Sequence, residues 1–133
     1  MSEGVRFLKV AVVGSKELVV INLQNYIPDG ATEIVCGSSK RLDQALLKYA
    51  SEKGLGFTEV LPDYRTFGRR APIKQRYDVI SAADEVVVFW DGVSQNMKMV
   101  IDHCNRVKIP VTVHVLSARN SDIRIVRGPI FNK

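Results

Sequence analysis

The sequence of 133 residues has few of the features that mark specialised classes of protein. Its two cysteines, Cys36 and Cys104, are too few for a disulfide framework, and no apolar run approaches the ~20 residues that a membrane-spanning helix needs. No tract is repetitive, and the first residues lack the basic and then apolar layout of a signal peptide. We therefore expect a cytoplasmic protein with reduced thiols and no contact with a membrane.

The composition is close to that of an ordinary globular domain. Hydrophobic residues make up 46% of the chain and charged residues 25%, and a single domain of this length buries roughly two thirds of its unfolded surface. Nineteen basic residues against fourteen acidic ones give a formal net charge of +5. This charge favours anionic partners, but it is below that of a dedicated DNA-coating protein.

Short apolar runs alternate with helical patterns along most of the chain. We expect strands over residues 7–13, 32–36, 57–61, 85–90 and 110–115, with the very apolar 85–90 run near the middle of the sheet. Alternation of this kind implies right-handed crossovers and parallel pairing. The sequence therefore predicts a single-domain α/β fold, a Rossmann-like three-layer sandwich with a mainly parallel five-stranded sheet. It occupies residues 1–116, and 117–133 form a carboxy-terminal extension with a possible short strand at 123–126.

Four helices are expected between these strands. The first begins at Ser15 and ends before the breaker at residues 28–30, the second ends at Gly54, and the third begins at Pro72. The side chains expected to face inward are Val19, Leu23, Tyr26 and Ile27 in the first helix, Leu42, Ala45, Leu46, Tyr49 and Ala50 in the second, Ile73, Tyr77 and Ile80 in the third, and Met97, Val100, Ile101, Cys104 and Val107 in the fourth.

Polar and glycine-containing turns follow the expected strands. In an open parallel sheet the ligand crevice lies beyond the carboxyl ends of the strands, where the strand order reverses. Residues 14–16, 36–40, 62–70 and 90–95 should therefore surround one mouth. Because these turns open helices, their free amides and the helix dipole favour an anion there.

The connection after the third strand is rich in basic residues. Five of them lie within twelve residues, with two aromatic residues interleaved: Arg65, Arg69, Arg70, Lys74 and Arg76, with Tyr64 and Phe67. Guanidinium groups suit phosphate oxygens, and aromatic rings can stack on a base. The alternative is a solvated loop whose arginines carry no ligand.

The segments KVAVVGS, EIVCGSSKRLD, LPDYRTFGRRAPIKQRYDVISAAD, VVVFWDGVSQNMKMVI and PVTVHV, in this order, resemble the YspA-like branch of the SLOG superfamily. That superfamily contains the Lonely Guy phosphoribohydrolases, the molybdenum-cofactor carrier-like proteins and the core of the DNA-processing protein DprA. The resemblance covers roughly residues 9–115. It implies a Rossmann-like fold that binds a nucleotide or a nucleotide-derived ligand, and it implies a homodimer.

The chain departs from the family pattern at the positions that would carry catalysis. Ser38 and Arg41 stand where the resemblance implies glycines in the second loop, and Asn96-Met97 replaces the Gly-Thr that opens the fourth helix. Val100 stands at the position where the resemblance implies the catalytic glutamate of the hydrolases. Met97 and Val100 therefore suit packing in the core better than contact with a ligand. In helix three the usual arginine and asparagine are replaced by Lys74 and Gln75.

The candidate ligand-binding residues are those of the mouth: Gly14, Ser15, Lys16, Gly37, Ser38, Ser39, Lys40, Arg69, Arg70, Lys74, Asp91, Gly92 and Ser94. Asp91 is the candidate acid if the protein is an enzyme, and turn formation is its alternative role. Asp43 lies in the first turn of its helix, where the dipole alone favours an acid. Cys36 ends a strand at the mouth and is expected to be a buried thiol rather than a reactive one.

Two histidines without nearby partners, His103 on an outward helix face and His114 in the last strand, indicate no metal site. The leading hypothesis is a non-catalytic binder or sensor of a nucleotide-like anion that requires no cofactor. The alternatives are a phosphoribohydrolase-like enzyme acting on nucleoside monophosphates and an interaction module with a filled cleft. For that module nucleic acid is a less favoured partner.

Overall fold

The computed structural model describes residues 6–16, 18–116 and 123–125, the last three as backbone only. The strands are β1 (Lys9–Gly14), β2 (Leu18–Val20), β3 (Glu33–Cys36), β4 (Gly56–Glu59), β5 (Glu85–Trp90), β6 (Val111–Val115) and β7 (Ile123–Ile125). The helices are α1 (Lys40–Lys53), α2 (Tyr64–Phe67), α3 (Ala71–Ser81) and α4 (Gln95–Val107), with short 3-10 turns η1 (Leu23–Asn25) and η2 (Gly68–Arg70).

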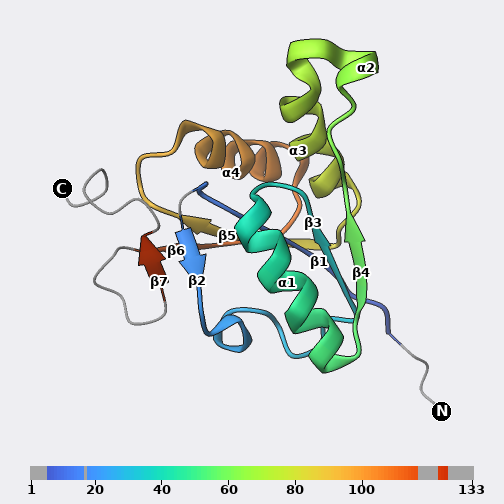
Figure 1. Cartoon of the computed structure of the whole chain (residues 1–133), viewed down its shortest axis with the longest axis vertical. Helices are drawn as coiled ribbons and strands as arrows, with labels where there is room; N and C mark the ends of the chain where they lie inside the picture. The colour runs from blue at the N-terminus through green and yellow to red at the C-terminus, as the bar shows by residue number, and fades with distance from the viewer. Residues whose placement is uncertain (1–5, 17, 117–122, 126–133) are drawn as a thin grey trace.

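Five strands form one all-parallel sheet in the order β4-β3-β1-β5-β6, which confirms the predicted α/β fold (Figure 1). The chain moves from β1 outward to β3 and β4, and then returns to β5 on the other side of β1. The strand order therefore reverses between β1 and β5, where Gly14 pairs with Phe89. This is the position at which a ligand crevice is expected in such a sheet.

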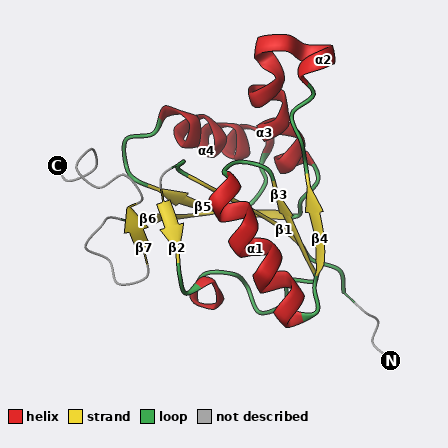
Figure 2. Ribbon diagram, viewed as in Figure 1, coloured by secondary structure: helices red, strands yellow, loops and turns green. Residues whose placement is uncertain are grey.

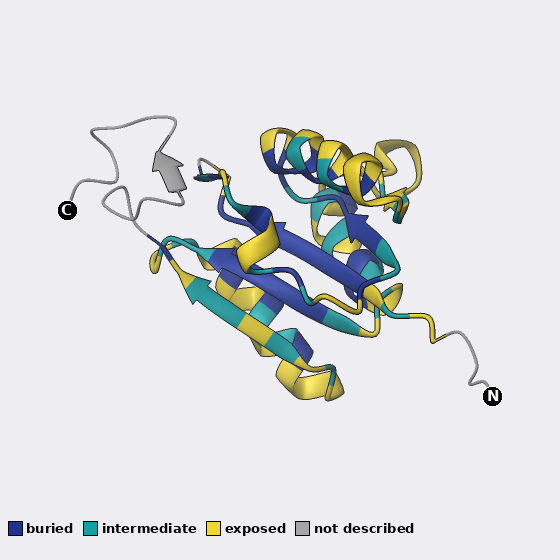
Figure 3. Ribbon diagram, turned by 90° about the horizontal axis from the view of Figure 1, so that it is seen from below, coloured by how far each residue is buried: buried dark blue, intermediate teal, exposed yellow. Residues whose placement is uncertain are grey.

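Each face of the sheet packs against its own layer, as Figure 2 shows. On one face Val10, Val12 and Phe89 pack with α1 and with the segment of β2 and η1. On the other face Ala11 and Val13 pack with α3 and α4. Neighbouring residues of β1 thus point to opposite layers, as the period of two in a strand requires. β5 lies inside the sheet with four of its six residues buried, as its apolar run predicted (Figure 3).

The predicted helix between the first two strands is wrong. Residues 18–20 form β2, which pairs in antiparallel register with β7, and only the η1 turn follows. Val19, Val20 and Ile21 are β-branched and suit a strand, and the partner that selects the strand is more than one hundred residues away in the sequence. β7 is the short strand predicted near the carboxyl terminus.

The second helix follows its sequence pattern closely. Leu42, Leu46 and Ala50 of α1 are buried, and Gly54 adopts a left-handed conformation (φ 69°) where its amide caps the helix. Pro72 lies in the first turn of α3, as predicted. These elements confirm the local signals of the sequence.

Two inward positions were predicted wrongly. Ile73 at the start of α3 is 40% exposed, and Val107 at the end of α4 is 45% exposed. Both lie in the terminal turns of their helices, outside the buried cluster that α3 and α4 form with the sheet. The connection 62–70, expected as a loop, contains α2 and η2, and α2 stands apart from the sheet at one end of the molecule (Figure 1).

In the part of the chain that the structure describes, none of the helices has the length and apolar character needed to cross a membrane.

Candidate functional site

A cavity of about 300 Å³ lies at the carboxyl ends of β1 and β3, beside the amino-terminal ends of α1 and α4. It is lined by Gly14, Lys16, Ser38, Ser39, Lys40, Arg76, Ser94, Asn96 and Met97. Six of these are predicted ligand candidates, drawn from three separate turns. The fold therefore assembles one mouth from the turns that the sequence singled out.

The hydroxyl groups of this mouth fasten its loops together. The Gly14 amide donates to Ser38 Oγ at 3.2 Å, and Ser39 Oγ donates to the Lys16 carbonyl at 3.3 Å. Ser15 is buried, and its Oγ accepts from the Asp91 amide at 3.1 Å. Ser38 Oγ is the acceptor of the Gly14 hydrogen bond, so the Ser38 O–H can still donate to a ligand. The Ser39 O–H already donates to the Lys16 carbonyl.

Gly37 lies where the loop before α1 packs closely against Val60 and Val79. It has φ of 152°, and a Cβ built on it would lie 2.5 Å from the Val60 carbonyl oxygen and 3.1 Å from a methyl group of Val79. Gln75 Nε2 donates to the same Val60 carbonyl at 2.8 Å. The glycine is therefore required where the loop passes the end of β4, and it does not line the cavity.

Asp91 and Gly92 form the turn after β5. Asp91 Oδ1 accepts hydrogen bonds from the amides of Val93 and Ser94 at 2.9 and 2.8 Å, and Gly92 has a positive φ of 88°. Ser94 then caps α4, with Oγ accepting from the Met97 amide at 3.4 Å, and Trp90 Nε1 donates to the Ser94 carbonyl. Asp91 thus shapes the turn that presents Ser94 to the cavity.

Three basic side chains line the cavity, and none of the acidic residues that the structure describes does. Lys16 and Lys40 come from the two loops, and Arg76 comes from the middle of α3. Burial lowers the pKa of Arg76, more than the neighbouring Tyr77 raises it, and Arg76 has no acidic partner among the described residues. Two helix amino termini add their partial positive charge, so the cavity has the electrostatics of an anion site.

The structure separates Arg76 from the other basic residues of the predicted cluster. Arg70 and Lys74 border a second cavity with Phe67, Ile73 and Tyr77, and Arg69 lies on the exposed η2 turn. Arg76, Asn96 and Met97 line the first cavity without having been among the ligand candidates. Arg76 lies one helical turn before buried Ile80, and this spacing was the available signal that it faces inward.

Asp43 and Cys36 form a buried polar pair beneath the loop before α1. Asp43 is 7% exposed, and its Oδ1 has no hydrogen-bond partner among the described residues. Burial raises the pKa of Asp43 to about 6, and Glu59 adds to this shift, while the Cys36 thiol and the amides of Ser38 and Gly37 oppose it. Burial together with Asp43 strongly raises the pKa of Cys36, so this thiol stays protonated.

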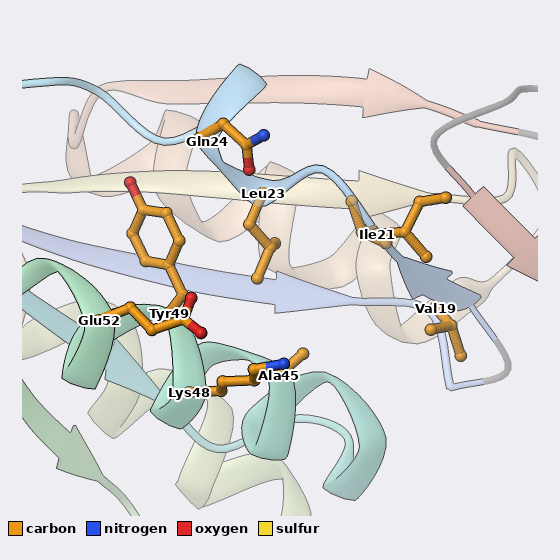
Figure 4. Close-up of a pocket in the computed structure, with 9 residues that line it drawn as sticks. Val19, Ile21, Leu23, Gln24, Ala45, Lys48, Tyr49 and Glu52 are labelled. Carbon is orange, nitrogen blue, oxygen red and sulfur yellow. The ribbon is translucent and has the colours of Figure 1, made fainter.

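A third cavity of about 300 Å³ lies on the other side of α1. It separates β2 and η1 from the α1 side chains Ala45, Lys48, Tyr49 and Glu52 (Figure 4). Burial, and to a lesser extent Asp29, raises the pKa of Tyr49. One lysine and one glutamate border this groove, so it lacks the single charge sign of the mouth.

The two histidines lie apart. His103 was expected on an outward face but is half-buried against Tyr77 with ring centroids 4.4 Å apart, and His114 packs against both Tyr26 and Phe89. Burial lowers the pKa of both imidazoles. Within residues 6–16, 18–116 and 123–125, no three His, Cys, Asp or Glu side chains are grouped to hold a metal ion.

No protein-family model matches this chain, and no curated protein or solved structure matches it significantly.

Proposed function

We propose that this protein is a non-catalytic binder or sensor of a nucleotide or a nucleotide-derived anion. The observation that carries the proposal is the cavity at the strand-order reversal, where Lys16, Lys40 and Arg76 gather and no described acidic residue lines the wall. A phosphate group is the anion that best suits this combination, because it accepts hydrogen bonds from several directions and its charge matches clustered cations.

The cavity offers both charge and hydrogen-bond donors to a phosphate. The O–H groups of Ser38 and Ser94 can donate to a ligand, since among the described residues both oxygens act only as acceptors. The first amides of α1 add further donors, because Ser39 makes no side-chain cap there. The half-buried Arg76 would gain most from an anion, since it is poorly solvated and no described acidic side chain pairs with it.

Hydrolysis is the weaker alternative for this site. Cleavage of an N-glycosidic bond needs a carboxyl group at the reacting atoms, and Val100 is a buried core residue. Asp91 does not line the cavity, and its Oδ1 already accepts two amides of the turn. The positive charge of the mouth suits retention of an anion, and no described carboxyl group lines the cavity to process it.

The resemblance to the YspA-like branch of the SLOG superfamily supports the same proposal, because that resemblance implies a nucleotide-derived ligand in a Rossmann-like fold. It also supports a homodimer in the cytoplasm. No cofactor is needed for a binding role of this kind.

A thermal-shift panel of nucleoside monophosphates, nucleotide sugars and inorganic phosphate tests the proposal. A ligand of the native state stabilises it by about 2.7 kcal/mol at a hundredfold excess over its dissociation constant. At least one member of the panel should raise the melting temperature. A parallel assay for release of free base should show none, and steady base release that Asp91→Asn abolishes would favour the enzyme instead.

A further inference from the structure

The helix α2, the turn η2 and the first residues of α3 form a basic projection that stands beyond the sheet (Figure 1). Several large apolar side chains are exposed on or beside it, among them Leu61, Tyr64 at 61%, Phe67 at 38% and Ile73. Single exposed apolar residues are common on protein surfaces, whereas a group of them marks an interaction site.

The same projection carries unbalanced positive charge. Five basic and two acidic residues lie from Pro62 to Asp78, and four of the basic ones belong to the projection because Arg76 lines the nucleotide cavity. Both acids are engaged locally, because Asp63 Oδ1 accepts from the Thr66 amide at 3.1 Å and Asp78 Oδ1 pairs with Lys74 Nζ at 2.6 Å. The guanidinium groups of Arg65, Arg69 and Arg70 have no acidic partner among the described residues.

A cavity of about 350 Å³ opens between these charges. Phe67, Ile73 and Tyr77 provide its apolar walls, and Arg70 and Lys74 border it. The Tyr77 ring is held against His103 at 4.4 Å between centroids, and Lys74 Nζ lies 5.6 Å from the centre of the Phe67 ring. The cavity thus combines aromatic surfaces with cations, and its size suits a single planar ring.

Charge excludes a second copy of this chain as the natural occupant. A twofold contact would bring Arg65, Arg69 and Arg70 against the same residues of the partner, and like charges repel. A partner protein needs about 1,000 Å² of shared surface for a stable complex, whereas the elements here are four and three residues long. An extended anion that carries flat apolar groups fits both the charge and the short cavity.

We propose that the basic projection binds single-stranded nucleic acid, with unpaired bases stacking on the exposed aromatic side chains and phosphates lying on the arginines. Base stacking on aromatic rings and phosphate contacts from arginine are the two sources of affinity in such complexes. A duplex hides its bases in its own stack, so it can use only the phosphate contacts. The proposal is independent of the nucleotide cavity, because the two cavities share no lining residue.

Fluorescence anisotropy with labelled 20-nucleotide oligo(dT), oligo(U) and a matched duplex tests the proposal. At 50 mM salt the wild type should bind both single strands more tightly than the duplex. Comparison of oligo(dT) with oligo(U) shows whether the protein prefers DNA or RNA. Arg69→Ala/Arg70→Ala should weaken binding about tenfold or more and reduce the slope of log affinity against log salt by about 1.4.

The aromatic contribution is tested separately. Tyr64→Ala/Phe67→Ala should weaken single-strand binding about tenfold without changing the salt slope, because stacking is not electrostatic. Lys48→Ala/Lys53→Ala removes two charges from the exposed face of α1 and serves as the matched control, and thermal unfolding checks that every variant folds. Absence of binding at 50 mM salt would overturn the proposal. Equal binding of single strand and duplex, an aromatic variant that binds like the wild type, or equally effective competition by a polyglutamate peptide would overturn it as well.

Discussion

The backbone amide of Gly14 donates a 3.2 Å hydrogen bond to Ser38 Oγ, and this bond joins the end of β1 to the loop that precedes α1. Gly14 is buried, so its amide has no access to water if the hydroxyl is removed. Ser38 thus occupies the place of an expected glycine and contributes a bond that glycine cannot make. The shape of this loop therefore depends on the Ser38 side chain.

Ser38→Ala should lower the free energy of unfolding by about 1–3 kcal/mol, because it leaves a buried amide without a partner. Chemical denaturation measures the change. Ser51→Ala is the control, since Ser51 is exposed on α1 and alanine is a better helix former there. Equal unfolding free energies for the two variants would show that the Gly14 bond contributes nothing.

Gly37→Ala should destabilise the fold by roughly 2 kcal/mol or more. The new Cβ would lie 2.5 Å from the Val60 carbonyl oxygen, and the backbone has a positive φ. Gly54→Ala shares the positive φ but has no atom within 4 Å of its Cβ, so it should cost only about 1 kcal/mol. Denaturant midpoints compare the two, and a smaller loss at Gly37 than at Gly54 would contradict the packing role.

Asp43 should make the protein less stable as the pH rises from about 4 to about 6. Burial raises the pKa of Asp43 from 3.8 to about 6 in the folded state, so over this range the folded chain holds a proton that the unfolded chain has lost. Ionisation inside the fold then costs on the order of 3 kcal/mol above pH 6. Asp43→Asn should therefore gain stability relative to the wild type between pH 4 and pH 7, measured by denaturation at each pH. A difference that does not change with pH would rule out this effect.

Both cysteines should resist thiol reagents in the native protein. Cys36 and Cys104 are fully buried, and burial raises the pKa of Cys104 to about 11 and that of Cys36 still further. Ellman's reagent should label neither thiol in buffer and both in denaturant. Rapid labelling of one thiol in buffer, lost in Cys36→Ser, would show instead that Cys36 is a reactive group at the mouth.

The sequence predicted the parts of the fold that depend on local signals. The apolar runs, Gly54 and Pro72 all act within a few residues, and the corresponding strands and helix ends are present. β2 could not be predicted in this way, because Val19 and Val20 fit a helical stripe as well as a strand, and the β7 partner that decides between them is distant in the sequence.

The site could be predicted only in part for a similar reason. The turns at the strand ends were placed by topology, so Lys16, Ser38, Lys40 and Ser94 come together as expected. The basic cluster is divided because α2 and η2 interrupt the chain before α3 begins, and the phase of α3 then decides which base faces the mouth. That phase directs Arg76 to the mouth and leaves Arg70 and Lys74 at the second cavity.

The most direct test of the account is the nucleotide thermal-shift panel on the wild type and on Arg76→Gln. The account predicts that a nucleotide stabilises the wild type, and that Arg76→Gln loses most of this shift because it removes the half-buried charge of the cavity. Arg106→Gln, at the far end of α4 from the cavity, should retain the full shift. A panel in which no nucleotide stabilises the wild type, or in which Arg76→Gln is stabilised as strongly as the wild type, would contradict the proposed function.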